Sequence, residues 1–166
     1  FRQGKSDLFV VEACEYRNHF LAFKPEVLVI TNVEFDHTDF FKSLAEVQAA
    51  FDEARAQAKK VVEKKDYGAV SVPGLLVPGE FNKENARAAK AAAKLLAPEV
   101  ADHVWDRSLA SYRGTWRRFE YKGPLPKGAL LYDDYAHHPT AITLTVAAAR
   151  EKFPGKKIVL FFHPHL

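Results

Sequence analysis

Apolar residues in this chain form short unbroken runs, and these runs predict β-strands. They occupy residues 7–11, 26–31, 129–133 and 157–162, and residues 117–121 also read as extended. In the runs at 7–11 and 26–31, unbroken apolarity in place of alternation is typical of strands that are buried on both faces, as in a parallel sheet. We therefore expect strands at these positions.

Between the runs, apolar residues recur at helical spacing. Residues 43–63 carry them three or four positions apart, residues 82–96 are rich in alanine, and residues 139–153 begin with a proline that suits a first helical turn. Alternating strands and helices predict an α/β fold. We place a domain boundary near residue 112, which gives domains 1–112 and 113–166.

Composition narrows the class of protein. The chain has 166 residues with 48% hydrophobic content and a net charge of +3, which does not indicate nucleic-acid binding. Its single cysteine, Cys14, excludes an internal disulfide, and no apolar run reaches the roughly 20 residues of a membrane span. We expect a soluble, cytoplasmic protein. Because the chain lacks an initial Met and stops directly after an expected strand, we also expect a fragment.

Polar residues follow three of the expected strands, where α/β proteins place their ligands. They are Glu12 and Glu15; Asn32, Glu34, Asp36, His37 and Asp39; and Asp133, Asp134, His137 and His138. A carboxylate and an imidazole from neighbouring strand ends suit Mg²⁺ or Mn²⁺ better than zinc. The alternative is structural, with Asp36 and Asp39 capping the next helix and His37 held in a loop hydrogen bond. The spacing leaves both open.

Residues 133–139 gather ionisable groups between a strand and a helix. Such a position can offer a carboxylate to a ribose hydroxyl and a helix N-terminus to a phosphate. Ordinary capping of the helix is the alternative. The Gly4-Lys5-Ser6 segment does not qualify as a phosphate-binding loop, because that motif needs an earlier glycine and must lead into a helix.

Five sequence blocks in one order resemble the Mur ligase family. The blocks run through residues 11–21, 31–39, 77–89, 114–120 and 133–140, and a Phe-His-Pro-His segment at 162–165 follows them. The resemblance implies part of a central ATP-binding domain with a parallel sheet, followed by the start of a Rossmann-like C-terminal domain. Within the family, the double histidine before Pro139-Thr140 resembles the branch that joins L-alanine to UDP-N-acetylmuramate.

The resemblance also implies a reaction. An ADP-forming ligase of peptidoglycan precursor synthesis would use ATP and Mg²⁺ to phosphorylate the carboxylate of UDP-N-acetylmuramate, and the amine of L-alanine would then attack the acyl phosphate. Glu12 and His37 match the catalytic positions that hold the metal. Neither nucleic acid, nor a membrane, nor an obligate protein partner is implied.

Five further residues match nucleotide-binding positions of the family. Asn82 and Asn85 match the asparagines that would hydrogen-bond adenine, and their amides carry the donor and acceptor that a purine edge requires. Arg118 would face the nucleotide from the hinge, Asp134 matches the carboxylate on the ribose, and His137 lies in the same loop.

This sequence departs from the family pattern in ways that keep alternatives open. It contains no glycine-rich loop with a phosphate-gripping lysine, and the stretch between Glu63 and Pro78 is short, so we predict that the chain alone is inactive. A murein tripeptide ligase or a folylpolyglutamate-type ligase would share the same motifs. A non-catalytic nucleotide-binding remnant fits the missing loop. A metal hydrolase using Glu12, His37, Asp134 and His138 is a further alternative.

Overall fold

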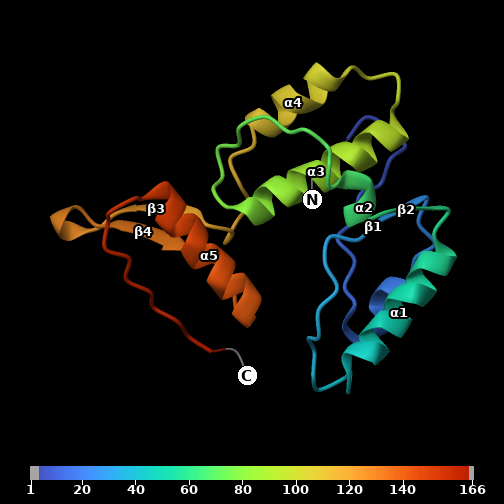
Figure 1. Ribbon diagram of the computed structural model, residues 1–166, viewed down its shortest axis with the longest axis horizontal. Coiled ribbons are helices and arrows are strands. Elements are labelled where there is room, and N and C mark those ends of the chain that lie inside the picture. The colour runs from blue at the N-terminus through green and yellow to red at the C-terminus, as the bar shows by residue number, and fades with distance from the viewer. Residues whose placement is uncertain (1–3, 165–166) are drawn as a thin grey trace. The chain divides into compact units, whose positions relative to one another are not determined.

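The computed structural model describes residues 4–164 and divides into two compact units, Phe1–Val61 and Val62–Leu166 (Figure 1). Each unit is described by itself. The expected family boundary near residue 112 lies inside the second unit, and it stays a prediction. Among the described residues, no helix is long and apolar enough to cross a membrane.

The first unit is a strand–helix–strand arrangement preceded by a short 3-10 segment. Its elements are η1 (Tyr16–Ala22), β1 (Val27–Val29), α1 (Leu44–Gln57) and β2 (Lys60–Val62). The amides of Lys59 and Lys60 donate to the carbonyls of Pro25 and Glu26, each at 3.1 Å. The partners advance together along both segments, so β1 and β2 form a small parallel sheet with α1 as the crossover.

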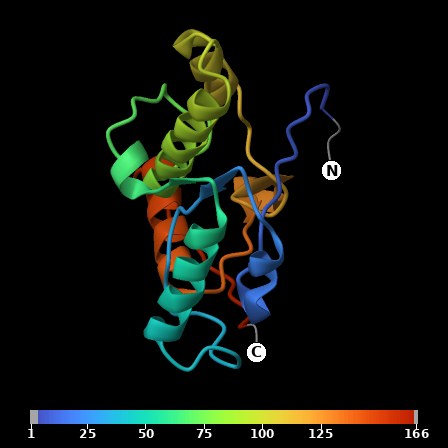
Figure 2. The ribbon, with the colours of Figure 1, turned by 90° about the vertical axis from the view of Figure 1, so that its right-hand side faces the viewer.

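The core of the first unit lies under one face of α1. Val47, Ala50 and Ala54 recur at helical spacing on that face and are buried against Phe20 and Phe41. Figure 2 shows η1, which carries Phe20, beside α1. The helix begins where the sequence predicts, because the Ser43 hydroxyl accepts a hydrogen bond from the Glu46 amide at 3.2 Å and caps the first turn.

The second unit combines helices with a β-hairpin. Its elements are α2 (Lys64–Tyr67), α3 (Glu80–Leu96), α4 (Asp102–Ala110), β3 (Glu120–Pro124), η2 (Pro126–Gly128), β4 (Leu130–Asp133) and α5 (Pro139–Lys152). Strands β3 and β4 pair antiparallel, with an irregularity between Tyr121 and Gly123. Helices α3 and α5 confirm the helices that the sequence predicts over residues 82–96 and 139–153.

A buried ammonium group joins α3 to α4. The Lys90 side chain is 3% exposed, and its Nζ lies 2.6 Å from an Asp106 oxygen and 3.4 Å from an Asp102 oxygen. It also donates to the Ser71 carbonyl at 3.0 Å. The hydrogen bond to Asp106 raises the pKa of Lys90, so this side chain stays charged although it is buried.

Helix α3 meets α5 at a position that requires glycine. Gly79 caps the N-terminus of α3 with φ +96°, and a Cβ there would lie 2.7 Å from a Phe81 ring carbon and 2.9 Å from the Ala148 Cβ. Ala148 itself is buried in α5. Only glycine combines this backbone conformation with so close an approach.

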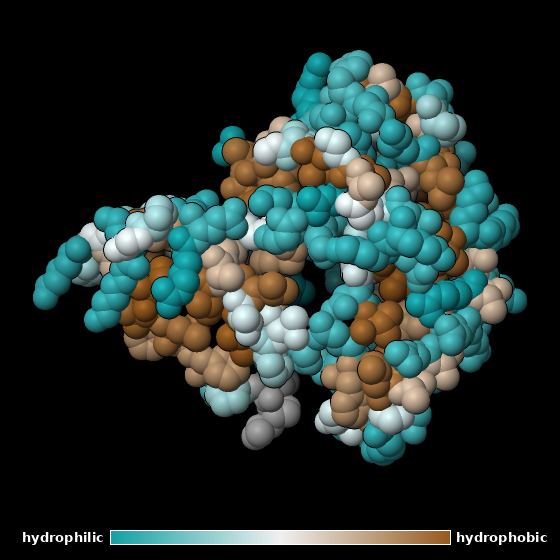
Figure 3. Space-filling model, in the orientation of Figure 1, coloured by the Kyte–Doolittle hydropathy of each residue, from teal (hydrophilic) through white to brown (hydrophobic). Residues whose placement is uncertain are grey.

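Two of the expected strands are wrong. Residues 7–11 and 157–162 form no strand, and Val10 and Phe161 in them are 87% and 93% exposed. A strand needs a hydrogen-bonded neighbour, and among the described residues neither segment has one. Figure 3 shows apolar surface on the side of the second unit formed by the hairpin and the segment after α5.

One further expectation is corrected, and one helix was not predicted. The helix expected over 43–63 ends at Gln57, because the chain turns extended at Ala58 and then pairs as β2. The parallel sheet expected for the N-terminal part of the chain is represented by β1 and β2, and the segments on either side of the expected turn at 123–127 pair as the antiparallel hairpin of β3 and β4. Helix α4 was not predicted; it is nine residues long and begins at Asp102, four residues after Pro98. The expected Phe-His-Pro-His motif ends at His165, which lies outside the described residues.

Candidate functional site

His37 lies in a tight loop of the first unit, between β1 and α1. Its backbone is left-handed with φ 53°, and its amide donates to an Asp36 carboxylate oxygen at 2.7 Å. The carbonyl of His37 accepts from the amides of Phe40 and Phe41, both at 2.9 Å. A non-glycine residue keeps a left-handed conformation at some cost, so these three bonds fix the position from which the imidazole projects.

The His37 imidazole is flanked by two residues that follow the 7–11 segment. Its Nε2 lies 3.3 Å from a Glu15 oxygen, and its ring packs against the Tyr16 ring with centroids 4.9 Å apart. The Tyr16 hydroxyl donates to an Asp39 oxygen at 2.6 Å, and this hydrogen bond lowers the pKa of Asp39. These contacts support the structural alternative, in which His37 is held in its loop by hydrogen bonds and packing.

The structure brings Glu15 to His37, and it gives Glu12 no such contact. Glu12 is exposed and makes no hydrogen bond or ion pair with any described residue. Within residues 4–164, no group of three or more His, Cys, Asp or Glu side chains could hold a metal ion. Mg²⁺ keeps several waters and binds through one or two carboxylates plus phosphates, so the expected magnesium site at Glu12 and His37 stays a prediction.

In the second unit, the two candidate asparagines lie one turn apart on α3. The Asn82 side-chain amide donates to the Pro78 carbonyl at 2.6 Å, which closes the first turn of the helix. Asn85 is exposed, and no described residue hydrogen-bonds to its amide. Residues three apart share a helix face, so Asn85 offers a free donor and acceptor beside the partly used amide of Asn82.

Asp134 joins two loops of the second unit. One oxygen accepts from the Phe119 amide at 2.7 Å, and the other accepts from the Ala136 amide at 2.8 Å and lies 3.4 Å from the Thr145 hydroxyl oxygen. These bonds hold the segment before β3 against the loop after β4. In the part of the chain that the structure describes, no side-chain hydrogen bond caps α5 at its N-cap residue, His138, so Asp134 joins the loops and does not cap the helix, while a ribose contact by Asp134 stays a prediction.

Arg117, which the sequence did not single out, is the best-connected cation of this region. Its guanidinium lies 4.7 Å from the Tyr135 ring centroid and 5.5 Å from that of Trp116, and its Nε lies 3.5 Å from an Asp133 oxygen. Its carbonyl accepts from the Tyr135 amide at 2.9 Å. The sequence offered one signal for Arg117, which is its place beside Arg118 in the block at residues 114–120.

Arg118 and His137 present their side chains differently from Arg117. Arg118 is exposed, and its backbone amide donates to the Thr115 carbonyl at 3.2 Å. A ring nitrogen of His137, Nδ1, lies 3.0 Å from the Tyr135 carbonyl oxygen. Both side chains reach the surface around the loops that Asp134 joins, which is where a nucleotide would have access to them.

Comparison with known proteins identifies relatives over nearly the whole chain. The family model "Mur ligase, glutamate ligase domain" matches residues 117–164. UDP-N-acetylmuramate–L-alanine ligases of Desulfitobacterium hafniense and Pediococcus pentosaceus are 36% and 32% identical over 98% and 95% of this chain. The alignment to the first spans 208 positions, so that relative has residues within the matched stretch that this 166-residue chain lacks.

Solved structures agree with the sequence comparison. The crystal structure of UDP-N-acetylmuramate-alanine ligase MurC from Thermotoga maritima matches 89% of this chain and 43% of its own, with a TM-score of 0.70 and 28% identity. MurF from Acinetobacter baumannii matches 76% of this chain and 37% of its own, with a TM-score of 0.54 at 19% identity, which shows similarity of fold alone.

The match covers only part of each relative. This chain spans about half the length of the curated relatives that it matches, 46% and 45% for the two ligases above. Nevertheless, nearly all of this chain is similar in sequence and in structure to proteins of one family. The chain belongs to the Mur ligase family.

Proposed function

We propose that this chain belongs to an ADP-forming ligase that joins L-alanine to UDP-N-acetylmuramate during peptidoglycan precursor synthesis. The observation that carries the proposal is its 36% identity, over 98% of its length, to the Desulfitobacterium hafniense protein of that activity. The ligase would transfer the γ-phosphate of ATP to the substrate carboxylate, and the amine of L-alanine would displace that phosphate as the amide forms.

The nucleotide half of the reaction is assigned to the second unit. Asn85 is exposed on α3 with an unused amide, which supports a role in reading the adenine edge beside Asn82. Arg118 and His137 would face the phosphates and ribose from the loops around β3 and β4. Asp134 would accept a ribose hydroxyl with lone pairs that its two amide bonds leave open, and it would also keep both loops in register.

The metal half is assigned to the first unit. Glu12 and His37 would hold Mg²⁺, and the contact of Glu15 with His37 makes Glu15 a further candidate oxygen donor. A bound magnesium ion would neutralise charge on the transferring phosphoryl group. The residues of this chain would hold the ion in position, because the loop hydrogen bonds of His37 and the packing of Tyr16 fix the place of the imidazole.

Calorimetry of Mg²⁺–ATP with the 166-residue chain tests the nucleotide assignment. We expect binding that weakens about tenfold in Asn85→Ala, because a lost hydrogen-bond pair to a buried purine edge removes roughly 1.5 kcal/mol. Gln48→Ala, an exposed helical substitution in the first unit, is the matched control. Equal binding by both variants would remove Asn85 from the site, and no binding by a folded chain would favour the non-catalytic remnant.

Substrate specificity has its own test. We expect ADP release to depend on both UDP-N-acetylmuramate and L-alanine in a longer protein that carries this sequence, and to be absent with a preformed tripeptide. Acceptance of the tripeptide in place of L-alanine would assign the chain to a tripeptide ligase. Turnover by the 166-residue chain alone would contradict the prediction that it is inactive by itself.

A further inference from the structure

The second unit contains a pocket of about 430 Å³ that none of the five proposed nucleotide-binding residues lines. Its wall comes from the segment before α3, the segment before β3, both strands of the hairpin and the end of α5. Six residues define its chemistry: Arg113, Trp116, Phe119, Tyr121, Tyr132 and Lys152. Its volume is in the range of small-molecule sites.

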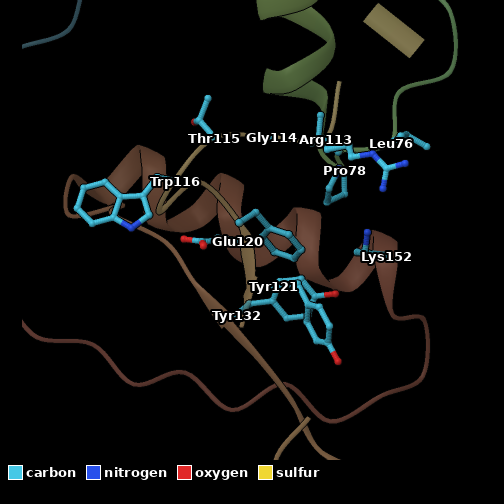
Figure 4. Close-up of a pocket in the computed structure, with 12 residues that line it drawn as sticks. Leu76, Pro78, Arg113, Gly114, Thr115, Trp116, Glu120, Tyr121, Tyr132 and Lys152 are labelled. Carbon is cyan, nitrogen blue, oxygen red and sulfur yellow. The ribbon is translucent and has the colours of Figure 1, made fainter. Parts of the chain in front are cut away.

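One end of the pocket is cationic. Arg113 and Lys152 line it, both are exposed, and neither makes a hydrogen bond or ion pair with any described residue. In Figure 4 their nitrogens lie at the same end of the pocket, away from Trp116. Two unpaired cations that converge on one cavity attract an anion, and a bound carboxylate or phosphate would give both of them a partner.

The rest of the pocket is aromatic and held in place. Tyr132 packs against Phe119 with centroids 4.8 Å apart, against Tyr121 at 5.2 Å and against Phe153 at 5.5 Å. Trp116 is anchored by the Arg117 guanidinium and remains 76% exposed. Ring faces fixed in this way prefer a flat, aromatic ligand, since stacking needs little further ordering of the protein.

Among the described residues, Glu120 is the one carboxylate in the wall, and it does not oppose an anion strongly. Glu120 accepts from the Arg117 amide at 2.9 Å and from the Lys122 ammonium at 3.1 Å. The first of these bonds is the main cause of the lowered pKa of Glu120, so its charge is already compensated. The free positive charge of the pocket therefore comes from Arg113 and Lys152.

We propose that this pocket binds a flat aromatic ring that carries a carboxylate or a phosphate, with the ring against Tyr132 and Trp116 and the anion on Arg113 and Lys152. The site is separate from the proposed nucleotide site, because Asn82, Asn85, Arg118, Asp134 and His137 do not line it. It therefore stands or falls independently of the proposed function.

The test uses probes that separate ring from charge. Titrations of the 166-residue chain, by calorimetry, compare 2-naphthoate and 2-naphthyl phosphate with neutral 2-naphthamide and with acetate. We expect the two aromatic anions to bind at least about tenfold more tightly than the amide or acetate. Whichever anion binds more tightly identifies the acidic group. In nitrogen-15 NMR spectra, the indole resonance of Trp116 should shift while that of Trp105 stays in place.

Substitutions of the cations decide whether the pocket itself is responsible. Arg113→Gln and Lys152→Gln should each weaken naphthoate binding about tenfold. Lys127→Gln removes the same charge outside the pocket, and Asn85→Ala alters the proposed nucleotide site; both should bind as the parent does. The proposal is overturned by equal affinity for the neutral amide, by unchanged affinity in both cation variants, or by no binding to a chain that circular dichroism shows to be folded.

Discussion

The two units of this protein hold their helices by different means. In the first, α1 lies on an apolar cluster that includes Phe20 and Phe41, and no charge enters that cluster. In the second, α3 is fixed to α4 by the buried ammonium of Lys90 and to α5 by a contact that only Gly79 permits. Apolar contacts tolerate small shifts, whereas a buried charge needs its partners in place. The packing of the helices is therefore more narrowly determined within the second unit than within the first.

The largest effect is expected from the apolar cluster. Phe41→Ala removes a side chain that is 4% exposed, and we expect a loss of about 3–5 kcal/mol in the free energy of unfolding because the cavity left behind cannot close fully. Urea titration followed by circular dichroism measures it. Phe40→Ala, at the neighbouring, 37% exposed position, should cost less than about 1 kcal/mol, and equal costs would contradict the assigned core.

The buried ammonium comes next. Lys90→Ala leaves Asp106 and Asp102 without their partner, and we expect a loss of about 3 kcal/mol, at the low end for buried pairs because both carboxylates still reach water. Tryptophan fluorescence reports this loss, since both tryptophans lie in the second unit. Lys94→Ala breaks only the exposed pair with Asp102 and should cost under about 1 kcal/mol.

The third largest effect on stability is expected at Gly79. Gly79→Ala adds a Cβ that meets Phe81 and Ala148 and places it on a backbone with φ +96°, so we expect a loss of about 2 kcal/mol. Gly74→Ala is the control, because its φ is ordinary and nothing lies within 4 Å of the added Cβ. Comparable thermal stability of the two variants would show that α3 and α5 can separate freely.

The smallest effect concerns pH. The Tyr16 hydrogen bond lowers the pKa of Asp39 below its usual 3.8, so its contribution is present above about pH 4 and is lost as pH falls through the folded-state pKa. Tyr16→Phe removes this hydrogen bond. Between pH 5 and pH 3, urea midpoints should therefore fall less steeply for the variant than for the parent, and parallel curves would contradict the assignment.

Sequence patterns predicted the elements whose causes are local. The Ser43 cap and the apolar spacing after it placed the start of α1, and Pro139 placed the start of α5. The runs at 7–11 and 157–162 were misread because strand formation depends on a neighbour that the run itself cannot supply. The end of α1 was misread for the same reason, since β2 pairs with a strand about thirty residues earlier.

The candidate site divides along the same line. Residue types and their order were enough to single out His37, Asn85 and Asp134, and to indicate the family to which the chain belongs. They were not enough to show that Glu15, and not Glu12, contacts His37, or that both oxygens of Asp134 bind backbone amides. The contacts of Glu15 with His37 and of Asp134 with Phe119 join residues that are well separated in the sequence, whereas the bond of Asp134 to Ala136 is local.

What the sequence determined by itself was the set of helices with local caps, the family and the residue types available for chemistry. Only the tertiary structure decided that Lys90, in an alanine-rich helix, is buried beside Asp106, and that Arg113 and Lys152 line one pocket. The physical reason is the range of the interactions. Capping and helical spacing act within a few residues, whereas charge pairing, strand pairing and cavity walls depend on where distant segments of the chain meet.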